Sequence, residues 1–219
     1  MFLGLAATSA PAMADLQYTL NQGGSVGPTP FKYGTVTLKQ LGAGTVGSPF
    51  HVQVTVSLQP GEVFLTTGSH SGFTWNLVGL GNPSSITITS ANAGLFNPPS
   101  LTAGSHGNSP FGSFEYAIEN TNTGGDGGIL GPLVFDIKRT GGLLLTDFSA
   151  NSDGNFFGAD IGTGCTFASG KWGFAATGVV ASNSPPVRVP EPGTWMLSMA
   201  GLAGLVGLTM QRRRKMARA

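Results

Sequence analysis

The chain has 219 residues, of which 40% are hydrophobic and only 10% charged, with 35 glycines, 14 prolines and a single cysteine. Glycine and proline stay below the share typical of structureless low-complexity sequence. The scarcity of charge argues against a long solvated helical bundle and against a nucleic-acid partner. Residues 15–187 carry five basic and nine acidic residues, a net charge of −4, whereas residues 188–219 carry six basic and one acidic residue, a net charge of +5. This asymmetry predicts a tail whose role is separate from that of the body.

Residues 1–14 have the pattern of a signal peptide. Residues 2–7 are apolar, and Ala12 and Ala14 form the A-x-A site of small residues that a signal peptidase accepts. No Lys or Arg precedes the apolar run, so we expect the signal peptide to be truncated at its start. A buried first strand or helix is the alternative. Cleavage after Ala14 would make Asp15 the first mature residue.

Residues 15–184 are predicted to form an extracytoplasmic all-β domain. The clearest strand is 50–58, in which Phe50, Val52, Val54, Val56 and Leu58 alternate with polar residues. Similar patterns predict strands at 33–39, 73–80, 85–89, 113–119, 133–138, 143–148, 156–161 and 171–177. Gly, Pro and Asn clusters separate these segments, which favours an antiparallel β-sandwich, with a jelly roll or a barrel as alternative arrangements. The composition of residues 92–110 predicts a long exposed loop.

The histidines give little indication of a metal site. His51 lies on the polar face of a predicted strand, while His70 and His106 occur in two Gly-Ser-His triplets whose loops could bring a pair of imidazoles together. Without neighbouring carboxylates, exposed loop histidines are the favoured interpretation. Ser69 and Ser105 lack the context of a nucleophile elbow. We therefore assign no catalytic residue.

Oxygen-bearing side chains between residues 147 and 160 raise the question of a Ca²⁺ site near Asp153 and Asn155. The spacing is not that of an EF-hand, and Asx turns explain the same residues. We expect no metal or other cofactor. Glu115 and Glu119 share one strand face about 13 Å apart, too far to act together on one glycosidic bond.

Three further side chains have a structural and a functional interpretation. Cys165 cannot form an intramolecular disulfide, and a buried small side chain is favoured over a free thiol or an intermolecular bridge. Trp75 and Trp172 could stack on sugar rings, but core packing is the favoured interpretation.

The end of the chain combines a stiff proline-rich linker (185–193), an uncharged run (194–210) and a basic tail (211–219). At 1.5 Å per residue, the uncharged run spans about 25 Å as a transmembrane helix, near the lower limit for a bilayer core. The basic cluster would stop transfer and keep the tail in the cytoplasm. A buried core helix is the alternative, but the run is apolar on all faces. The candidate motif residues in the linker are Val189, Pro190, Glu191 and Pro192. The residues expected to stop transfer and set the orientation in the membrane are Arg212, Arg213, Arg214 and Lys215.

Together, the Pro-Glu-Pro triplet, the short apolar span and the terminal basic cluster resemble the PEP-CTERM sorting signal. The resemblance covers about the last 30 residues. It implies that Pro190, Glu191 and Pro192 are recognised by an exosortase, a transpeptidase-like membrane enzyme of Gram-negative bacteria that removes or exchanges the tail. It also implies an association with exopolysaccharide and biofilm.

The sequence therefore predicts an exported protein that is anchored in the inner membrane before processing and then reaches the cell surface or the extracellular matrix. Its β domain would be non-catalytic, with a structural role or a role in binding exopolysaccharide. One alternative is a secreted hydrolase acting on polysaccharide or protein, and another is a membrane protein whose tail is never cut.

Overall fold

The computed structural model describes residues 14–79, 85–90, 95–96, 106–121 and 127–190. These residues form antiparallel strands and a single turn of 3-10 helix, η2 (Leu145–Asp147). The prediction of an all-β domain is therefore confirmed. The strands are β1 Asp15–Leu20, β2 Gln22–Gly23, β3 Gly34–Leu41, β4 His51–Leu58, β5 Val63–Phe64, β6 Phe73–Leu77, β7 Ile86–Ser90, β8 His106–Gly107, β9 Ser113–Phe114, β10 Tyr116–Ile118, β11 Leu133–Arg139, β12 Phe148–Ser149, β13 Phe157–Thr163, β14 Thr166–Ala168, β15 Lys171–Gly173, β16 Ala176–Ser182 and β17 Val187–Val189.

The first sheet contains the strands β17-β1-β3-β4-β11-β7 in that order, and the neighbouring pairs from β1 to β7 are antiparallel. Val54 in β4 lies opposite Leu38 in β3 and Phe135 in β11. Because alternate residues of a strand point to the same face, this register turns one apolar face of the sheet toward the core. The alternation predicted for residues 50–58 and 133–138 is thus confirmed by the burial of β4 and β11.

The second sheet has the order β10-β6-β13-β16-β2, with β12 paired to β6 and β5 paired to β13. Its strand β13 is buried along almost its whole length. Two glycines in β13 permit the close approach of neighbouring groups. A Cβ atom on Gly158 would lie 2.8 Å from Thr74 Oγ1, and one on Gly162 would lie 2.5 Å from the ring of Phe174. A side chain at either position would therefore disturb the centre of the sheet.

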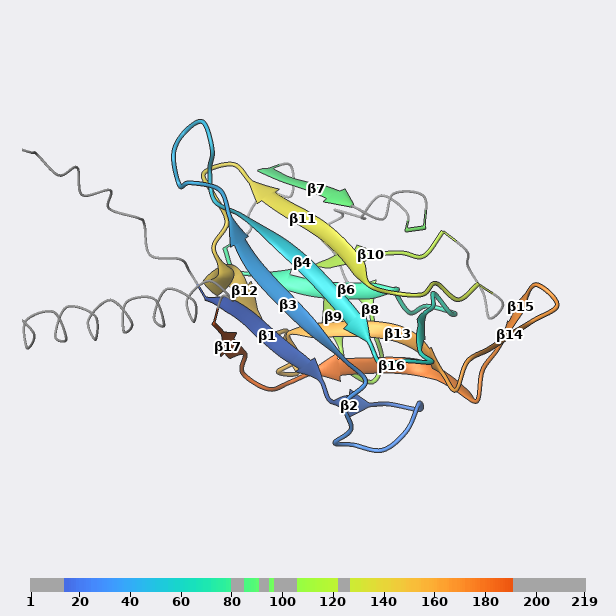
Figure 1. Ribbon diagram of the computed structural model, residues 1–219. Coiled ribbons are helices and arrows are strands. Elements are labelled where there is room, and N and C mark those ends of the chain that lie inside the picture. Colours follow the sequence, from blue (N-terminus) through green and yellow to red (C-terminus); the bar gives the residue numbers. More distant parts are fainter. Residues whose placement is uncertain (1–13, 80–84, 91–94, 97–105, 122–126, 191–219) are drawn as a thin grey trace, which may run out of the picture. The chain divides into compact units, whose positions relative to one another are not determined.

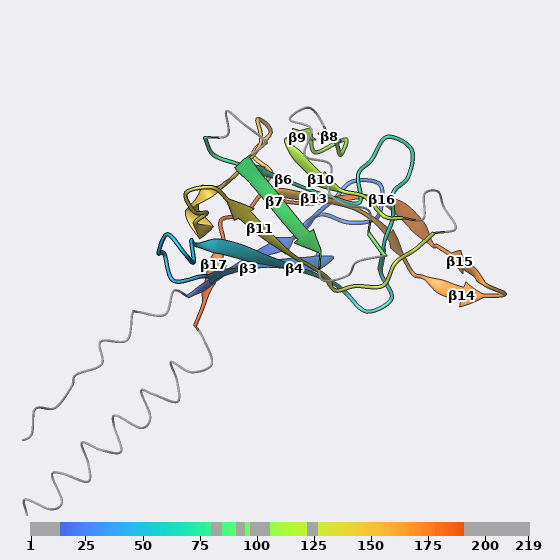
Figure 2. The same cartoon turned by 90° about the horizontal axis from the view of Figure 1, so that it is seen from above.

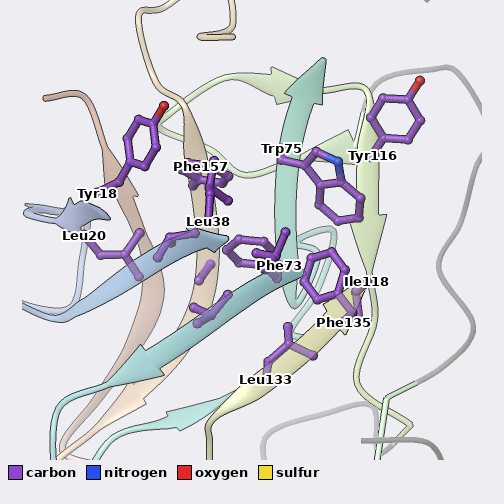
Figure 3. Packing of buried hydrophobic residues seen from close by; sticks show 14 of the residues in the cluster. Tyr18, Leu20, Leu38, Phe73, Trp75, Tyr116, Ile118, Leu133, Phe135 and Phe157 are labelled. Atoms are coloured by element: carbon purple, nitrogen blue, oxygen red, sulfur yellow. The ribbon is translucent and has the colours of Figure 1, made fainter. Parts of the chain in front are cut away.

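The apolar faces of the two sheets share one hydrophobic core. The strands of the first sheet cross over those of the second (Figure 1 and Figure 2). Phe135 of the first sheet lies 6.0 Å from Phe73 and 5.2 Å from Trp75 of the second, measured between ring centroids. Tyr18 of β1 meets Phe157 of β13 at 4.9 Å. Figure 3 shows these rings filling the space between the sheets, the arrangement of a two-layer β fold.

The strand predicted at 143–148 is wrong, because this segment forms η2 and only enters β12 at Phe148. Side chains replace the ladder hydrogen bonds here. Gln40 donates to the carbonyl of Leu143 at 2.8 Å and accepts from the N–H of Leu145 at 3.1 Å. Asp147 accepts from the N–H of Leu144 at 2.9 Å. The apolar pattern of the segment reflects burial, not strand pairing.

Three other expectations need correction. The strand predicted at 113–119 is interrupted between β9 and β10, where the N–H of Glu115 donates to Asn76 Oδ1 at 2.7 Å. The strand predicted at 171–177 is divided between β15 and β16. The loop predicted at 92–110 falls partly outside the described residues, but its described end contains β8 and the fully buried Asn108, so that end is not an exposed loop.

A two-stranded hairpin, β14–β15, extends from the sheets (Figure 1). Its turn holds Ser169 at φ 53° and Gly170 at φ 77°, the left-handed pair that tight hairpins favour. Phe167 and Trp172 face each other across the hairpin with their ring centroids 5.0 Å apart. An isolated hairpin is marginally stable, so this aromatic pair contributes to holding the two strands together.

Candidate functional site

The predicted sorting motif begins at the end of the described β domain. Val189, the last residue of β17, is half-buried, and Pro190 after it is exposed. Proline fixes φ and lacks an N–H donor, which favours an extended chain in this linker. The remaining parts of the predicted signal lie outside the described residues, namely Glu191, Pro192, the run 194–210 and the basic residues Arg212, Arg213, Arg214 and Lys215.

Leu16–Val187 form a compact unit of their own. The unit begins two residues after Ala14 and ends inside the predicted proline-rich linker 185–193. Ala14 is half-buried and directly precedes β1, while Ala12 lies outside the described residues. The residues of the hydrophobic core all fall between Tyr18 and Val180. A cut after Val187 would therefore leave the core in one piece. Within the described residues, no helix has the length and apolar character needed to cross a bilayer.

A buried polar cluster holds the loop between β5 and β6. Asp160 in β13 is fully buried, and its Oδ2 accepts hydrogen bonds from the N–H and the hydroxyl of Thr67, each at 2.6 Å. Glu119 Oε2 accepts from the N–H of Gly72 at 3.1 Å and from the hydroxyl of Thr66 at 3.3 Å. Asp160 thus holds the start of the loop, and Glu119 joins its start at Thr66 to its end at Gly72.

Burial raises the pKa of Asp160 above its ordinary value. The hydrogen bonds from Thr67 and the proximity of His70 oppose this rise, and the proximity of Glu119 adds to it. Oδ1 of Asp160 has no hydrogen-bond partner among the described residues. A proton on Oδ1 would therefore leave the bonds from Thr67 to Oδ2 intact.

The loops that carry His70 and His106 are linked by a buried side chain. Asn108, which is fully buried, accepts from the N–H of Ser71 at 3.0 Å and donates to Thr74 Oγ1 at 2.8 Å. His70 Nδ1 and His106 Nε2 are both buried, and neither has a hydrogen-bond partner in the described part of the chain. Both histidines are half-buried, which corrects the expectation that they are exposed.

The other candidates for acid–base or nucleophilic chemistry lie apart in the fold. His51 lies in β4 opposite Lys138, and its Nδ1 is 3.3 Å from the carbonyl oxygen of Pro49. Ser69 is exposed in the loop before β6, and Ser105 lies outside the described residues. Glu115 is exposed, and its Oε2 accepts from the N–H of Leu77 at 3.4 Å.

Asn151 organises the loop in which a Ca²⁺ site was considered. Its Oδ1 accepts from the N–H of Asp153 at 3.0 Å and from that of Asn155 at 2.9 Å. The Nδ2 groups of Asn151 and Asn155 both donate to the carbonyl of Phe111, at 2.8 and 3.1 Å. The two bonds to Asn151 Oδ1 are the local bonds of an Asx turn, and the two bonds to Phe111 tie this turn to a distant segment. In the part of the chain that the structure describes, no three His, Cys, Asp or Glu residues are grouped to hold a metal ion.

The two tryptophan candidates differ in their surroundings. Trp75 is fully buried and stacks on Phe73 and Tyr116 (Figure 3), so it packs in the core and cannot meet a sugar. Trp172 is half-buried in the β14–β15 hairpin, beside the backbone of Gly128. Its neighbour Phe167 is 62% exposed. The exposed aromatic surface of the hairpin therefore comes mainly from Phe167, which the sequence did not single out.

Glu62 is a buried titratable group that could not be singled out from the sequence. It is only 8% exposed, and burial raises its pKa from the ordinary value of 4.5 to about 7, against the effect of a hydrogen bond from Gln59. Cys165 is half-buried instead of fully buried, and its thiol donates to the carbonyl of Gly162 at 3.1 Å. Burial raises the pKa of this thiol.

The compact unit Leu16–Val187 consists of β-strands, and the predicted sorting signal begins next to its end. Residues 188–215 match the family described as the PEP-CTERM protein-sorting motif, so the chain is a protein with a PEP-CTERM sorting signal. This signal implies export, membrane-anchored sorting and processing by an exosortase. Neither a curated protein nor a solved structure matches this chain significantly.

Proposed function

We propose that this chain is a surface or matrix protein of a Gram-negative bacterium, delivered by an exosortase that removes its tail. The precursor would span the inner membrane with residues 194–210, with the basic cluster 212–215 on the cytoplasmic side. The Pro190-Glu191-Pro192 triplet would lie on the outer side as an extended substrate. The observation that carries this proposal is the match of residues 188–215 to the sorting motif.

The division of the chain supports processing next to the folded domain. The match to the sorting motif begins at Arg188, immediately after the compact unit ends at Val187. An exosortase that acts beyond β17 (Val187–Val189) would leave both sheets intact. The product would be a stable β domain, free of the positively charged tail.

For the β domain itself we propose a non-catalytic role, either structural or in contact with exopolysaccharide. The carboxylates of Asp160 and Glu119 are both engaged in holding one loop. Asn151 and Asn155 are similarly engaged in a turn. Polar side chains that hold loops and turns in place stabilise a scaffold. Their engagement here supports the proposal that the β domain presents surface loops and not a reaction site.

Mass spectrometry of the mature C-terminus tests the proposed processing. The full chain would be produced in a host that has an exosortase and in the same host without the enzyme. We expect a product that lacks Arg212, Arg213, Arg214 and Lys215 only when the enzyme is present. Glu191→Ala should reduce this product, whereas Lys171→Ala, which removes an exposed charge outside the matched residues 188–215, should leave it unchanged.

An intact basic terminus in the host with exosortase would contradict processing and would favour a permanently anchored protein. The role of the β domain needs a second measurement. The purified protein should bind the host's exopolysaccharide or remain in the matrix fraction without shortening the polymer. Release of reducing ends from that polymer would favour the hydrolase instead.

A further inference from the structure

Glu62 lines a small surface pocket that none of the proposed roles uses. The pocket has a volume of about 230 Å³ and lies between the turn after β4 and the segment before β11. Leu58, Pro60, Leu130 and Pro132 give it mainly aliphatic walls. Leu130 is 60% exposed, so its side chain presents aliphatic surface to solvent at the pocket.

Glu62 is itself part of the pocket wall, although it is only 8% exposed. Gly131 is also part of this wall, and the ring of Phe64 lies close to it, because a Cβ atom on that glycine would lie 3.3 Å from Phe64 Cε2. The pocket therefore places a largely buried carboxyl side chain beside aliphatic ones.

The carboxylate of Glu62 lacks a cationic partner. It makes no ion pair with any described Lys, Arg or His, and its Oε2 is buried without a hydrogen-bond partner. The titratable groups whose pKa Glu62 raises through its charge, Tyr33 and Cys165, are not cations. A buried carboxylate without a counter-ion is costly, and a ligand that brings a positive charge would relieve that cost.

We propose that this pocket binds a primary ammonium group on an aliphatic stem, the chemistry of a lysine side chain, with Glu62 as its counter-ion. The aliphatic walls suit a chain of methylene groups better than a hydroxylated ring. An ammonium group carries three N–H donors, and the carboxylate of Glu62 would accept from it. Because burial keeps Glu62 protonated up to about pH 7, binding below that pH releases a proton. The site is independent of whether the tail is processed.

An NMR titration of the full chain in detergent micelles tests this site. The probes are n-butylammonium, its neutral counterpart n-butanol, and glucosamine as an ammonium on a hydroxylated ring. We expect saturable shifts at Glu62 and Leu130 with n-butylammonium only, and tighter binding at pH 8 than at pH 6. Glu62→Gln should weaken this binding about tenfold, the weight of one hydrogen bond to a charged group, and remove its pH dependence.

Two variants serve as controls. Asp153→Asn removes an exposed carboxylate outside the pocket and should leave the affinity unchanged. Leu130→Lys, at an exposed position, places an ammonium group of the chain itself at the pocket and should block the probe. Equal binding of n-butanol, a preference for glucosamine, or unchanged affinity in Glu62→Gln would each overturn the proposal.

Discussion

Asp160 and Thr67 are 93 residues apart in the sequence, yet one carboxylate oxygen of Asp160 accepts both the N–H and the hydroxyl of Thr67 at 2.6 Å. The backbone of Asp160 also closes the same loop, because it accepts from the N–H of Leu65 and donates to the carbonyl of Gly72. A single residue in β13 therefore fixes the loop at its start and its end. Loops held in this way keep their conformation without disulfides.

Replacing Asp160 tests this role directly. Asp160→Ala leaves two donors of Thr67 unsatisfied and should lower the free energy of unfolding by about 2–4 kcal/mol. Asp160→Asn keeps a carbonyl oxygen in place of Oδ2 and should cost less than about 1 kcal/mol. Guanidinium denaturation measures both values, and hydrogen exchange at Thr67 reports the loop. Equal destabilisation by the two substitutions would contradict the hydrogen-bonding role.

Trp75 should behave as a core residue. Trp75→Ala removes a ring that packs against Phe73, Tyr116 and Phe135, and should cost about 3–5 kcal/mol in the free energy of unfolding. Trp172→Ala in the hairpin is the matched comparison and should cost less than half of that. Chemical denaturation followed by circular dichroism measures the difference. If Trp172→Ala proved the more harmful change, the assignment of Trp75 to the core would be wrong.

Glu62 makes stability depend on pH. Its folded pKa of about 7 lies above the ordinary value of 4.5, so the folded state holds the proton more tightly. The stability linked to this proton is fully present below pH 4.5 and is lost as the pH rises through 7. Glu62→Gln should therefore be more stable than the native chain by about 2 kcal/mol at pH 8 and nearly equal to it at pH 4. Thermal unfolding across this range checks the sign, and a benefit largest at pH 4 would contradict it.

Removal of the tail should leave the stability of the β domain nearly unchanged. A chain that ends at Pro190 keeps the whole compact unit Leu16–Val187. We expect its denaturant midpoint and its slope to equal those of the full chain in the same detergent, because the slope reflects the surface exposed on unfolding. A shift of the midpoint that corresponds to more than about 1 kcal/mol would show that the tail contributes to the fold.

The strands that could be predicted are those with one buried face. Residues 50–58 and 133–138 alternate because β4 and β11 show one side to the core and the other to solvent. β13 was identified from its apolar residues, although it is buried on both sides. The short strands β2, β5 and β8 could not be predicted, since two residues are too few to establish a period. The six-residue strand β1 was not predicted either, because only Tyr18 and Leu20 in it are fully buried.

The buried polar contacts could not be predicted from the sequence, because they join distant residues. Asn108 links two loops through Ser71 and Thr74, and nothing near Asn108 in the chain indicates that it is buried. Gln40 likewise converts a predicted strand into η2 by holding Leu143 and Leu145. The sorting motif could be predicted from the sequence. Its Pro-Glu-Pro triplet, uncharged run and basic cluster follow one another along the chain, and their order is sufficient to recognise the motif.

The compact unit ends at Val187 and the sorting match starts at Arg188, so the boundary between them falls inside the short strand β17. Substitutions within Leu16–Val187 can therefore accumulate without changing a residue of the matched motif. The same label could be fused behind an unrelated β, α or mixed domain and still direct it, and this body could be redirected by exchanging some thirty residues at its end.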